Sequence, residues 1–212
     1  MSKHPWTVST ADDFLGLPAM ISGCGEETAE AQDIDALLMQ QVTQGDHAAF
    51  ESLVKKYQKS LLNFFVRMGA SSDSEDLVQN TFVRLYQYRD RYQATAKFTT
   101  FLYVLAYRVW ADLGRKRQRR ERLRSSLETD QHISPSLAPA ADAPAIDVEA
   151  ALATLSDKLR DVIVLNFYQG LPYQAIADVL HIPLGTVKSR INLAITALRD
   201  HFHETDDPPN RR

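Results

Sequence analysis

Two clusters of basic side chains have the chemistry and the spacing for contact with nucleic acid. The first is Lys188, Ser189 and Arg190, which directly follow the segment Pro183-Leu184-Gly185-Thr186-Val187. The second is a run with Glu121 as its single acid, and its basic members are Arg115, Lys116, Arg117, Arg119, Arg120, Arg122 and Arg124. Lys and Arg bind phosphates by displacing counterions, and Arg also recognises guanine in the major groove. DNA is therefore the first ligand to consider.

Aromatic side chains accompany the second basic cluster. They are Tyr86, Tyr88 and Tyr92 before a short polar segment, and Phe98, Phe101, Tyr103, Tyr107 and Trp110 after it. A base that stacks on an aromatic ring contributes roughly 1–3 kcal/mol of binding free energy. Some of these rings must fill the core, and the others are candidates for contact with unpaired bases.

Apolar spacing predicts the helices that position the first basic cluster. Val162, Ile163, Leu165 and Phe167 form one apolar face, and Pro172 suits the first turn of the next helix. Thr186 is the predicted cap of a last helix, whose buried stripe is Val187, Ile191, Ala194, Ile195 and Leu198. Two helices joined by so short a turn cross steeply, so Lys188 would project from the start of a recognition helix. A helical hairpin with solvated charges is the alternative.

The same spacing predicts four helices upstream. They cover Asp35 to Gln44, Ala48 to Met68, a segment opened by a capping box of Ser72 and Glu75, and Phe98 to Arg122. Their buried stripes are Phe50, Leu53, Val54, Tyr57, Leu61, Leu62 and Phe65 in the second helix, Leu77, Val78, Phe82 and Leu85 in the third, and Leu102, Leu105, Ala106, Val109 and Leu113 in the fourth. No pattern of strands alternates with these helices, so the predicted fold class is all-α.

Composition divides the 212 residues into two small helical domains joined by a flexible linker. The predicted parts are an acidic N-terminal extension over 1–32, a domain over 33–121, a linker over 122–146, a domain over 147–202 and a tail over 203–212. The linker is rich in Pro, Ala, Ser and acids and poor in bulky apolar residues, which predicts no fixed structure. Hydrophobic residues make up 44% of the chain, enough for two modest cores.

Two segments carry a family resemblance. Gly170-Leu171-Pro172-Tyr173, Ile176-Ala177 and the segment from Pro183 to Arg190 resemble region four of bacterial RNA polymerase sigma factors of the extracytoplasmic-function (ECF) group. The segment from Ser74 to Tyr86 resembles region two of the same group. A single helix-turn-helix would be weak evidence, but two matched modules in the family's order are specific. The resemblance implies a transcription initiation factor that binds core RNA polymerase and directs it to promoter DNA.

The resemblance also implies a role for each candidate site residue. The residues that it implies contact core polymerase are Asp76, Leu77, Gln79, Asn80, Phe82 and Arg84. Those that it implies bind and melt the minus-ten element are Arg89, Arg91, Tyr92, Lys97, Phe98, Phe101, Arg108, Arg115 and Lys116. Those that it implies bind the minus-thirty-five element are Tyr173, Thr186, Lys188, Ser189, Arg190 and Asn192. In the family, a base extruded from the non-template strand is held by the loop that corresponds to residues 92–97. Extrusion costs a few kcal/mol of stacking and pairing free energy, so a pocket for the extruded base makes melting depend on sequence.

The sequence departs from the family pattern in the upstream module and in the recognition helix, where Asn192, Leu193, Ile195 and Thr196 replace positions that are often basic in the family. Asn80 stands where an acid is usual, Phe101 where Trp is common, and Tyr107-Arg108 where Arg-Asn is frequent. These departures leave the preferred bases undetermined. The family often has an anti-sigma factor, which is a further candidate partner.

Other classes of function find little support in the sequence. There is no phosphate-binding glycine loop, HExxH motif or nucleophile elbow, so we predict no enzymatic activity and no cofactor. Cys24 is the single cysteine, and His201 and His203 lack further ligands, so we predict no metal site. No apolar run is long enough for a membrane span and no signal peptide is evident, which predicts a cytoplasmic protein without membrane insertion. The main rival is a stand-alone helix-turn-helix transcriptional regulator, which would need no second module.

Overall fold

The computed structural model describes residues 33–125 and 148–206, and every regular element in these two ranges is helical. The first range contains α1 (Ile34–Thr43), α2 (His47–Arg67), α3 (Ser74–Gln87), the 3₁₀ turn η2 (Arg89–Arg91) and α4 (Phe98–Ser125). The second contains α5 (Val148–Thr154), α6 (Asp157–Ile163), the π-helical turn η3 (Val164–Tyr168), α7 (Tyr173–Leu180) and α8 (Leu184–Asp206). The predicted all-α fold class is confirmed.

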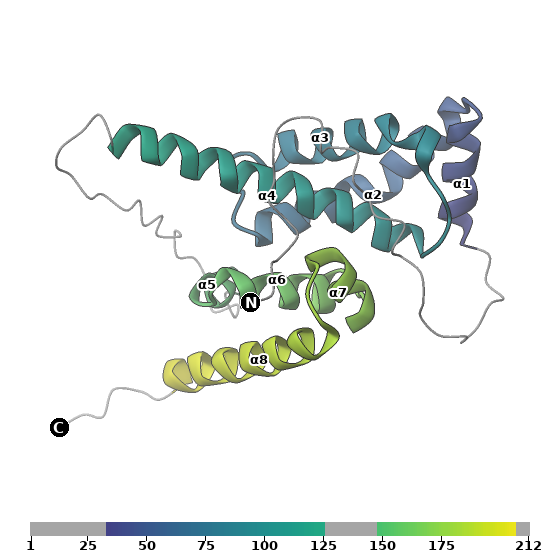
Figure 1. Cartoon of the computed structure of the whole chain (residues 1–212). Coiled ribbons are helices and arrows are strands. Elements are labelled where there is room, and N and C mark those ends of the chain that lie inside the picture. Colours follow the sequence, from purple (N-terminus) through teal and green to yellow (C-terminus); the bar gives the residue numbers. More distant parts are fainter. Residues whose placement is uncertain (1–32, 126–147, 207–212) are drawn as a thin grey trace, which may run out of the picture.

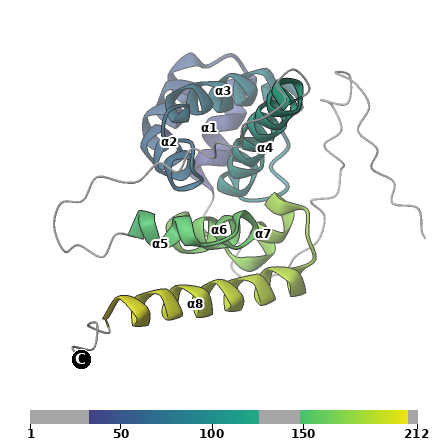
Figure 2. The ribbon, with the colours of Figure 1, turned by 90° about the vertical axis from the view of Figure 1, so that its left-hand side faces the viewer.

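The helices form an upper and a lower layer (Figures 1 and 2). Helices α1 to α4 form a bundle in the upper layer, and α5, α6 and α7 lie beneath it with α8 along the base. The predicted stripes supply the upper core, because Leu53, Leu61, Phe65, Leu85 and Leu102 have no exposed surface. Burial of such side chains is the main favourable contribution to folding. Among the described residues, no helix combines the length and apolar character needed to cross a membrane.

One carboxylate joins the start of α1 to the start of α4. Asp33 caps α1, since its Oδ1 atom accepts hydrogen bonds from the amides of Asp35 at 3.2 Å and Ala36 at 3.3 Å. Its Oδ2 atom accepts the amide of Phe98, the first residue of α4, at 2.7 Å. The first amides of a helix have no partner within the helix, so Asp33 stabilises two helix ends at once.

Two helices begin at other residues than the sequence suggested. The predicted capping box of Ser72 and Glu75 is absent, because α3 begins at Ser74 and its N-cap residue, Asp73, makes no side-chain capping bond. Helix α8 begins at Leu184, three residues before the start that a Thr186 cap predicts, and the Thr186 amide donates to the Pro183 carbonyl at 2.8 Å inside the first turn. Helices α4 and α8 also run past the predicted domain ends, to residues 125 and 206.

The lower layer contains two irregular features. The π-helical turn η3 interrupts the predicted helix, and Phe167 in this turn is 62% exposed, whereas it was predicted to lie on the buried face. Helix α7 ends at Leu180 and is followed by His181, whose φ of 53° is in the left-handed region and which begins the turn to α8.

The two layers pack against each other. Helix α4 contacts α7, and η3 contacts α2, so buried side chains of both layers belong to a single apolar cluster. The sequence predicted two domains tethered by a linker but gave no indication of this packing.

Candidate nucleic-acid interface

The helix-turn-helix presents a polar surface at the start of α8. Lys188, Ser189 and Asn192 are exposed, while Thr186 and Arg190 are half-buried. The helix is held in place by Val187, Ile191 and Ala194, which are buried against the rest of the lower layer. Tyr173 begins α7 and is 38% exposed. Most of the predicted residues therefore lie in the first turns of α8, the part of such a motif that enters a major groove, and Tyr173 lies at the start of α7.

Helix α4 carries the second basic cluster on its exposed C-terminal part. The side chains from Arg115 to Arg124 are exposed. Two of them are paired with acids of the same layer, Arg115 with Asp112 and Arg117 with Asp73. Exposed ion pairs of this kind contribute little to stability, so the arginines remain free to exchange an acid for a phosphate.

The aromatic residues near the start of α4 form a packed cluster. The ring of Tyr92 lies 5.1 Å from that of Phe101 and 6.3 Å from that of Phe98, measured between centroids. Phe98 is fully buried and Phe101 is 7% exposed, so neither ring is available to stack on a base in this conformation. Burial raises the pKa of Tyr92 to about 12, and its buried hydroxyl has no hydrogen-bond partner among the described residues.

The basic residues predicted to follow the DNA path are only partly accessible. Arg91 and Lys97 are exposed at either end of the loop over 92–97. Arg89 is half-buried, where it lies over the Tyr86 ring at 4.2 Å and donates to the Tyr86 carbonyl at 2.9 Å. Arg108 is also half-buried, and burial lowers its pKa. It lies close enough to His181 of the lower layer to help lower the pKa of that imidazole, after burial itself.

Helix α3 separates the residues predicted to bind core polymerase into two sets. Asp76, Gln79 and Asn80 are exposed on the outer face, while Leu77 and Phe82 are buried in the core. Arg84 is half-buried and donates to Asp112 of α4 at 2.7 Å.

Sequence reasoning missed one residue of this outer face, Val83, which is 52% exposed. Residues three or four positions apart share a helix face, so Val83 extends the surface of Gln79 and Asn80. Its signal in the sequence was an apolar side chain outside the buried stripe. An exposed apolar residue between polar ones is typical of the centre of a protein interface.

The described ranges contain no cluster of three or more His, Cys, Asp or Glu side chains that would hold a metal ion. His203 and Cys24 lie outside the residues whose side chains are described.

Comparison with known proteins identifies the family. The model of sigma-70 region 2 matches residues 53–120, and that of sigma-70 region 4 matches residues 151–200. The RNA polymerase sigma-H factor of Pseudomonas aeruginosa is 30% identical over 179 residues, which are 79% of this chain and 93% of that protein. The chain belongs to the ECF group of RNA polymerase sigma factors. The ECF sigma factor SigW of Bacillus subtilis is 29% identical over 78% of this chain and 95% of its own length.

Solved structures of sigma factors share the fold. CnrH in complex with the cytosolic domain of CnrY aligns with a TM-score of 0.61 at 26% identity, over 82% of this chain and 99% of CnrH. The sigma factor RpoE of Bartonella quintana, solved with the anti-sigma factor NepR, aligns with a TM-score of 0.59 at 24% identity, over 74% of this chain and 98% of RpoE. As a sigma factor, the protein is not an enzyme; it binds RNA polymerase and directs it to promoters through regions 2 and 4.

Proposed function

We propose that this sigma factor binds core polymerase through the outer face of α3. The observation that supports this is the exposed surface of Asp76, Gln79, Asn80 and Val83 on a helix whose opposite face is fully packed. Polar groups around one apolar side chain suit a surface that forms and releases a protein complex. Leu77 and Phe82 then act as supports that hold this face in position. Arg84 acts in the same way, through its ion pair with Asp112.

Promoter melting is assigned to the loop over 92–97 and the basic part of α4. Arg91 and Lys97 bracket the loop, and Arg115 and Lys116 begin the exposed basic run. These cations attract the DNA backbone, and a loop that binds an extruded base stabilises the open promoter. Tyr92, Phe98 and Phe101 support the loop from below, and Arg89 lies beside it.

Recognition of the minus-thirty-five element is assigned to the start of α8. Lys188, Ser189 and Asn192 contact bases or phosphates there, and Arg190 joins them. Tyr173 and Thr186 contact the DNA backbone beside the groove.

In the proposed division of the chain, the two DNA-binding domains cover 33–121 and 147–202. Because the polymerase holds both domains, binding of one to DNA raises the effective concentration of the other at its own element. The protein acts in the cytoplasm, and an anti-sigma factor is a further partner, as NepR is in the complex with RpoE.

Co-purification with core polymerase and promoter-directed transcription test this assignment. Asp76→Arg should abolish co-purification, because it reverses the charge of the one acid in the proposed surface. The matched control is Asp200→Arg, an equal charge change at an exposed acid of α8, outside the proposed surface. Binding by Asp76→Arg at the wild-type level would refute the polymerase surface. DNA binding at a defined operator without any polymerase would favour the stand-alone regulator.

A further inference from the structure

The loop over 92–97 is held mainly at its two ends. Gln93 and Thr95 in its middle are exposed, and the Thr95 amide donates to the Gln93 carbonyl at 2.9 Å. Exposed side chains do little to fix a backbone conformation, so the shape of this loop depends on the structure that anchors its ends. Those ends adjoin η2 at Tyr92 and α4 at Phe98.

Helix α1 contacts the elements at both ends of the loop. It packs against η2 and against α4. The Oδ2 atom of Asp33, at the start of α1, accepts the amide of Phe98 at 2.7 Å. Because the other oxygen of Asp33 caps α1 itself, the position of this carboxylate relative to α1 is fixed. The hydrogen bond therefore fixes the point at which the loop ends and α4 begins.

A second carboxylate of α1 helps to hold the ring of Phe98. Asp35 is 7% exposed and accepts hydrogen bonds from the Tyr57 hydroxyl at 2.5 Å and from Lys56 Nζ at 2.6 Å. The ring of Tyr57 lies 5.5 Å from that of Phe98, measured between centroids. The charges of both carboxylates also help to raise the pKa of Tyr92, after burial itself. The start of α1 thus acts on the residues at both ends of the loop.

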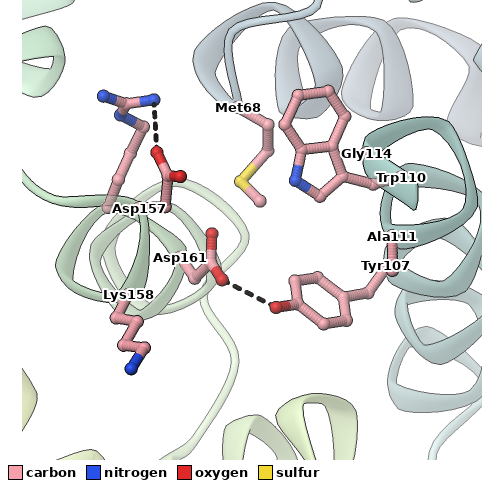
Figure 3. Close-up of a pocket in the computed structure, with 9 residues that line it drawn as sticks. Met68, Tyr107, Trp110, Ala111, Gly114, Asp157, Lys158 and Asp161 are labelled. Atoms are coloured by element: carbon pink, nitrogen blue, oxygen red, sulfur yellow. Dashed lines mark hydrogen bonds and ion pairs between the residues drawn. The ribbon is translucent and has the colours of Figure 1, made fainter. Parts of the chain in front are cut away.

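A contact with the lower layer holds α4 at a different place. The Tyr107 hydroxyl, in the middle of α4, donates to the Oδ2 atom of Asp161 of α6 at 2.7 Å (Figure 3). This contact positions the body of the helix. The bond from Phe98 to Asp33 acts at the first residue of the helix, where the loop joins it.

We propose that Asp33 is a positioning residue for promoter melting, because through the Phe98 amide it holds the loop over 92–97 in the shape that receives an extruded base. A loop that is already in its binding shape avoids the cost of ordering when the base enters. Asp33 lies outside residues 53–120, which the sigma-70 region 2 model matches. The proposal rests on the proposed function, which assigns base capture to this loop.

Base capture can be measured with the complete holoenzyme. The full chain is assembled with core polymerase and bound to the single-stranded non-template strand of a minus-ten element, taken from a promoter that the wild-type holoenzyme opens. Nucleotides of this strand are replaced one at a time with an abasic site, and fluorescence anisotropy gives each affinity. At the position whose base enters the loop, the wild type should lose about tenfold in affinity.

Two substitutions of Asp33 separate positioning from stability. Asp33→Ala removes both the α1 cap and the bond to Phe98. Asp33→Asn keeps an oxygen that caps α1 but places an amide nitrogen, which cannot accept, beside the Phe98 amide. Although the second change destabilises the fold less, both should reduce the abasic effect to about twofold or less, because both remove the bond that shapes the loop.

The matched control is Asp46→Ala. It removes the cap of α2, whose bonds to Ala48 and Ala49 do not involve the loop. This variant should keep the wild-type abasic effect. All measurements are made at a temperature at which circular dichroism shows wild-type helix content for every variant, and each variant should bind core polymerase as the wild type does.

The results separate this proposal from the proposed function. A reduced abasic effect in both Asp33 variants, with the wild-type effect in Asp46→Ala, supports the positioning role. A full effect in either Asp33 variant would overturn it, and so would an equal reduction in Asp46→Ala, because loss of a cap would then be a sufficient cause. A wild-type holoenzyme that responds to no abasic site in the element would instead refute base capture by the loop, and with it the proposed function.

Discussion

Asp161 has an unusual electrostatic environment for a single residue. Burial raises its pKa from 3.8 to about 6, and the neighbouring Asp157 acts in the same direction. The hydrogen bond from Tyr107 and the charges of Arg160 and Arg190 oppose the rise. A carboxyl group whose pKa is higher in the folded chain than in the unfolded chain makes the free energy of unfolding depend on pH.

Because the pKa of Asp161 is raised in the folded state, we predict that its contribution to the free energy of unfolding becomes more favourable as the pH falls. In the unfolded chain its pKa returns to the ordinary value, so the folded state binds the proton more tightly between about pH 4 and 6. Relative to Asp161→Asn, the wild-type free energy of unfolding should therefore rise by about 2 kcal/mol as the pH falls from 7.5 to 4.5. Urea unfolding of both proteins at several pH values measures the difference.

His181 acts in the opposite direction and must be separated from Asp161. Its pKa is lowered, first by burial and then by Arg108, so its protonation favours the unfolded state below pH 6.5. Both proteins retain His181, so its effect cancels in the difference between them. Parallel stability curves for wild type and Asp161→Asn would show that the carboxyl does not carry the pH dependence.

At the scale of helices, Asp33 is predicted to stabilise more than an ordinary N-cap residue. Each capping bond to a helix start contributes about 1 kcal/mol, and Asp33 serves both α1 and α4. Asp33→Ala should therefore lower the free energy of unfolding by about 2–3 kcal/mol. Asp33→Asn should have an intermediate effect, because an amide has a single oxygen and its nitrogen cannot accept the Phe98 amide.

Asp46 provides the control for this prediction. Its Oδ1 atom caps α2 through the amides of Ala48 at 2.8 Å and Ala49 at 3.1 Å, without a bond to a second helix. Asp46→Ala should cost about 1 kcal/mol. Equal losses for Asp33→Ala and Asp46→Ala in thermal and urea unfolding would show that the bond to Phe98 contributes nothing.

The sequence predicted helices well where burial follows a regular spacing. The stripes of α2 and α4 recur at helical intervals, and most of their predicted members, such as Leu53 and Leu102, are buried. Helix starts were less predictable, because several neighbouring residues compete for the cap. In α8, the Pro183 carbonyl accepts the first amides of the helix, so the helix begins before Thr186. The wide turn of η3 shifts the helical period, which explains why Phe167 faces outward.

The candidate site was predictable only as far as local spacing determines exposure. Gln79 and Lys188 are exposed because each lies outside the buried stripe of its own helix. Arg84 is half-buried beside Asp112, which is distant in sequence, and Arg108 is half-buried on α4, which packs against α7 of the lower layer. Helical spacing does not predict contacts between residues that are distant in sequence. The contacts between the two layers are all of this kind, so the sequence did not predict them.

At the scale of the whole molecule, charge is unevenly distributed along the chain. The formal net charge is −3, yet the exposed end of α4 is strongly basic. Between Lys3 and Lys55 there is no Lys or Arg, and residues 1–32 carry Asp12, Asp13, Glu26, Glu27 and Glu30. These residues lie outside the described ranges. Acids on the same chain as a basic surface repel DNA or compete with it for the cations.

Removal of the five N-terminal charges is therefore predicted to increase DNA affinity. Changing the two Asp to Asn and the three Glu to Gln would bring the formal net charge from −3 to about +2. Affinity of the free protein for promoter DNA should rise several-fold at low salt, and the gain should disappear near 0.5 M salt because of screening. The control neutralises five exposed acids elsewhere, namely Glu51, Glu75, Glu149, Asp157 and Asp200. An equal gain in this control, in titrations followed by fluorescence anisotropy, would mean that net charge alone matters and that the N-terminal acids have no special role.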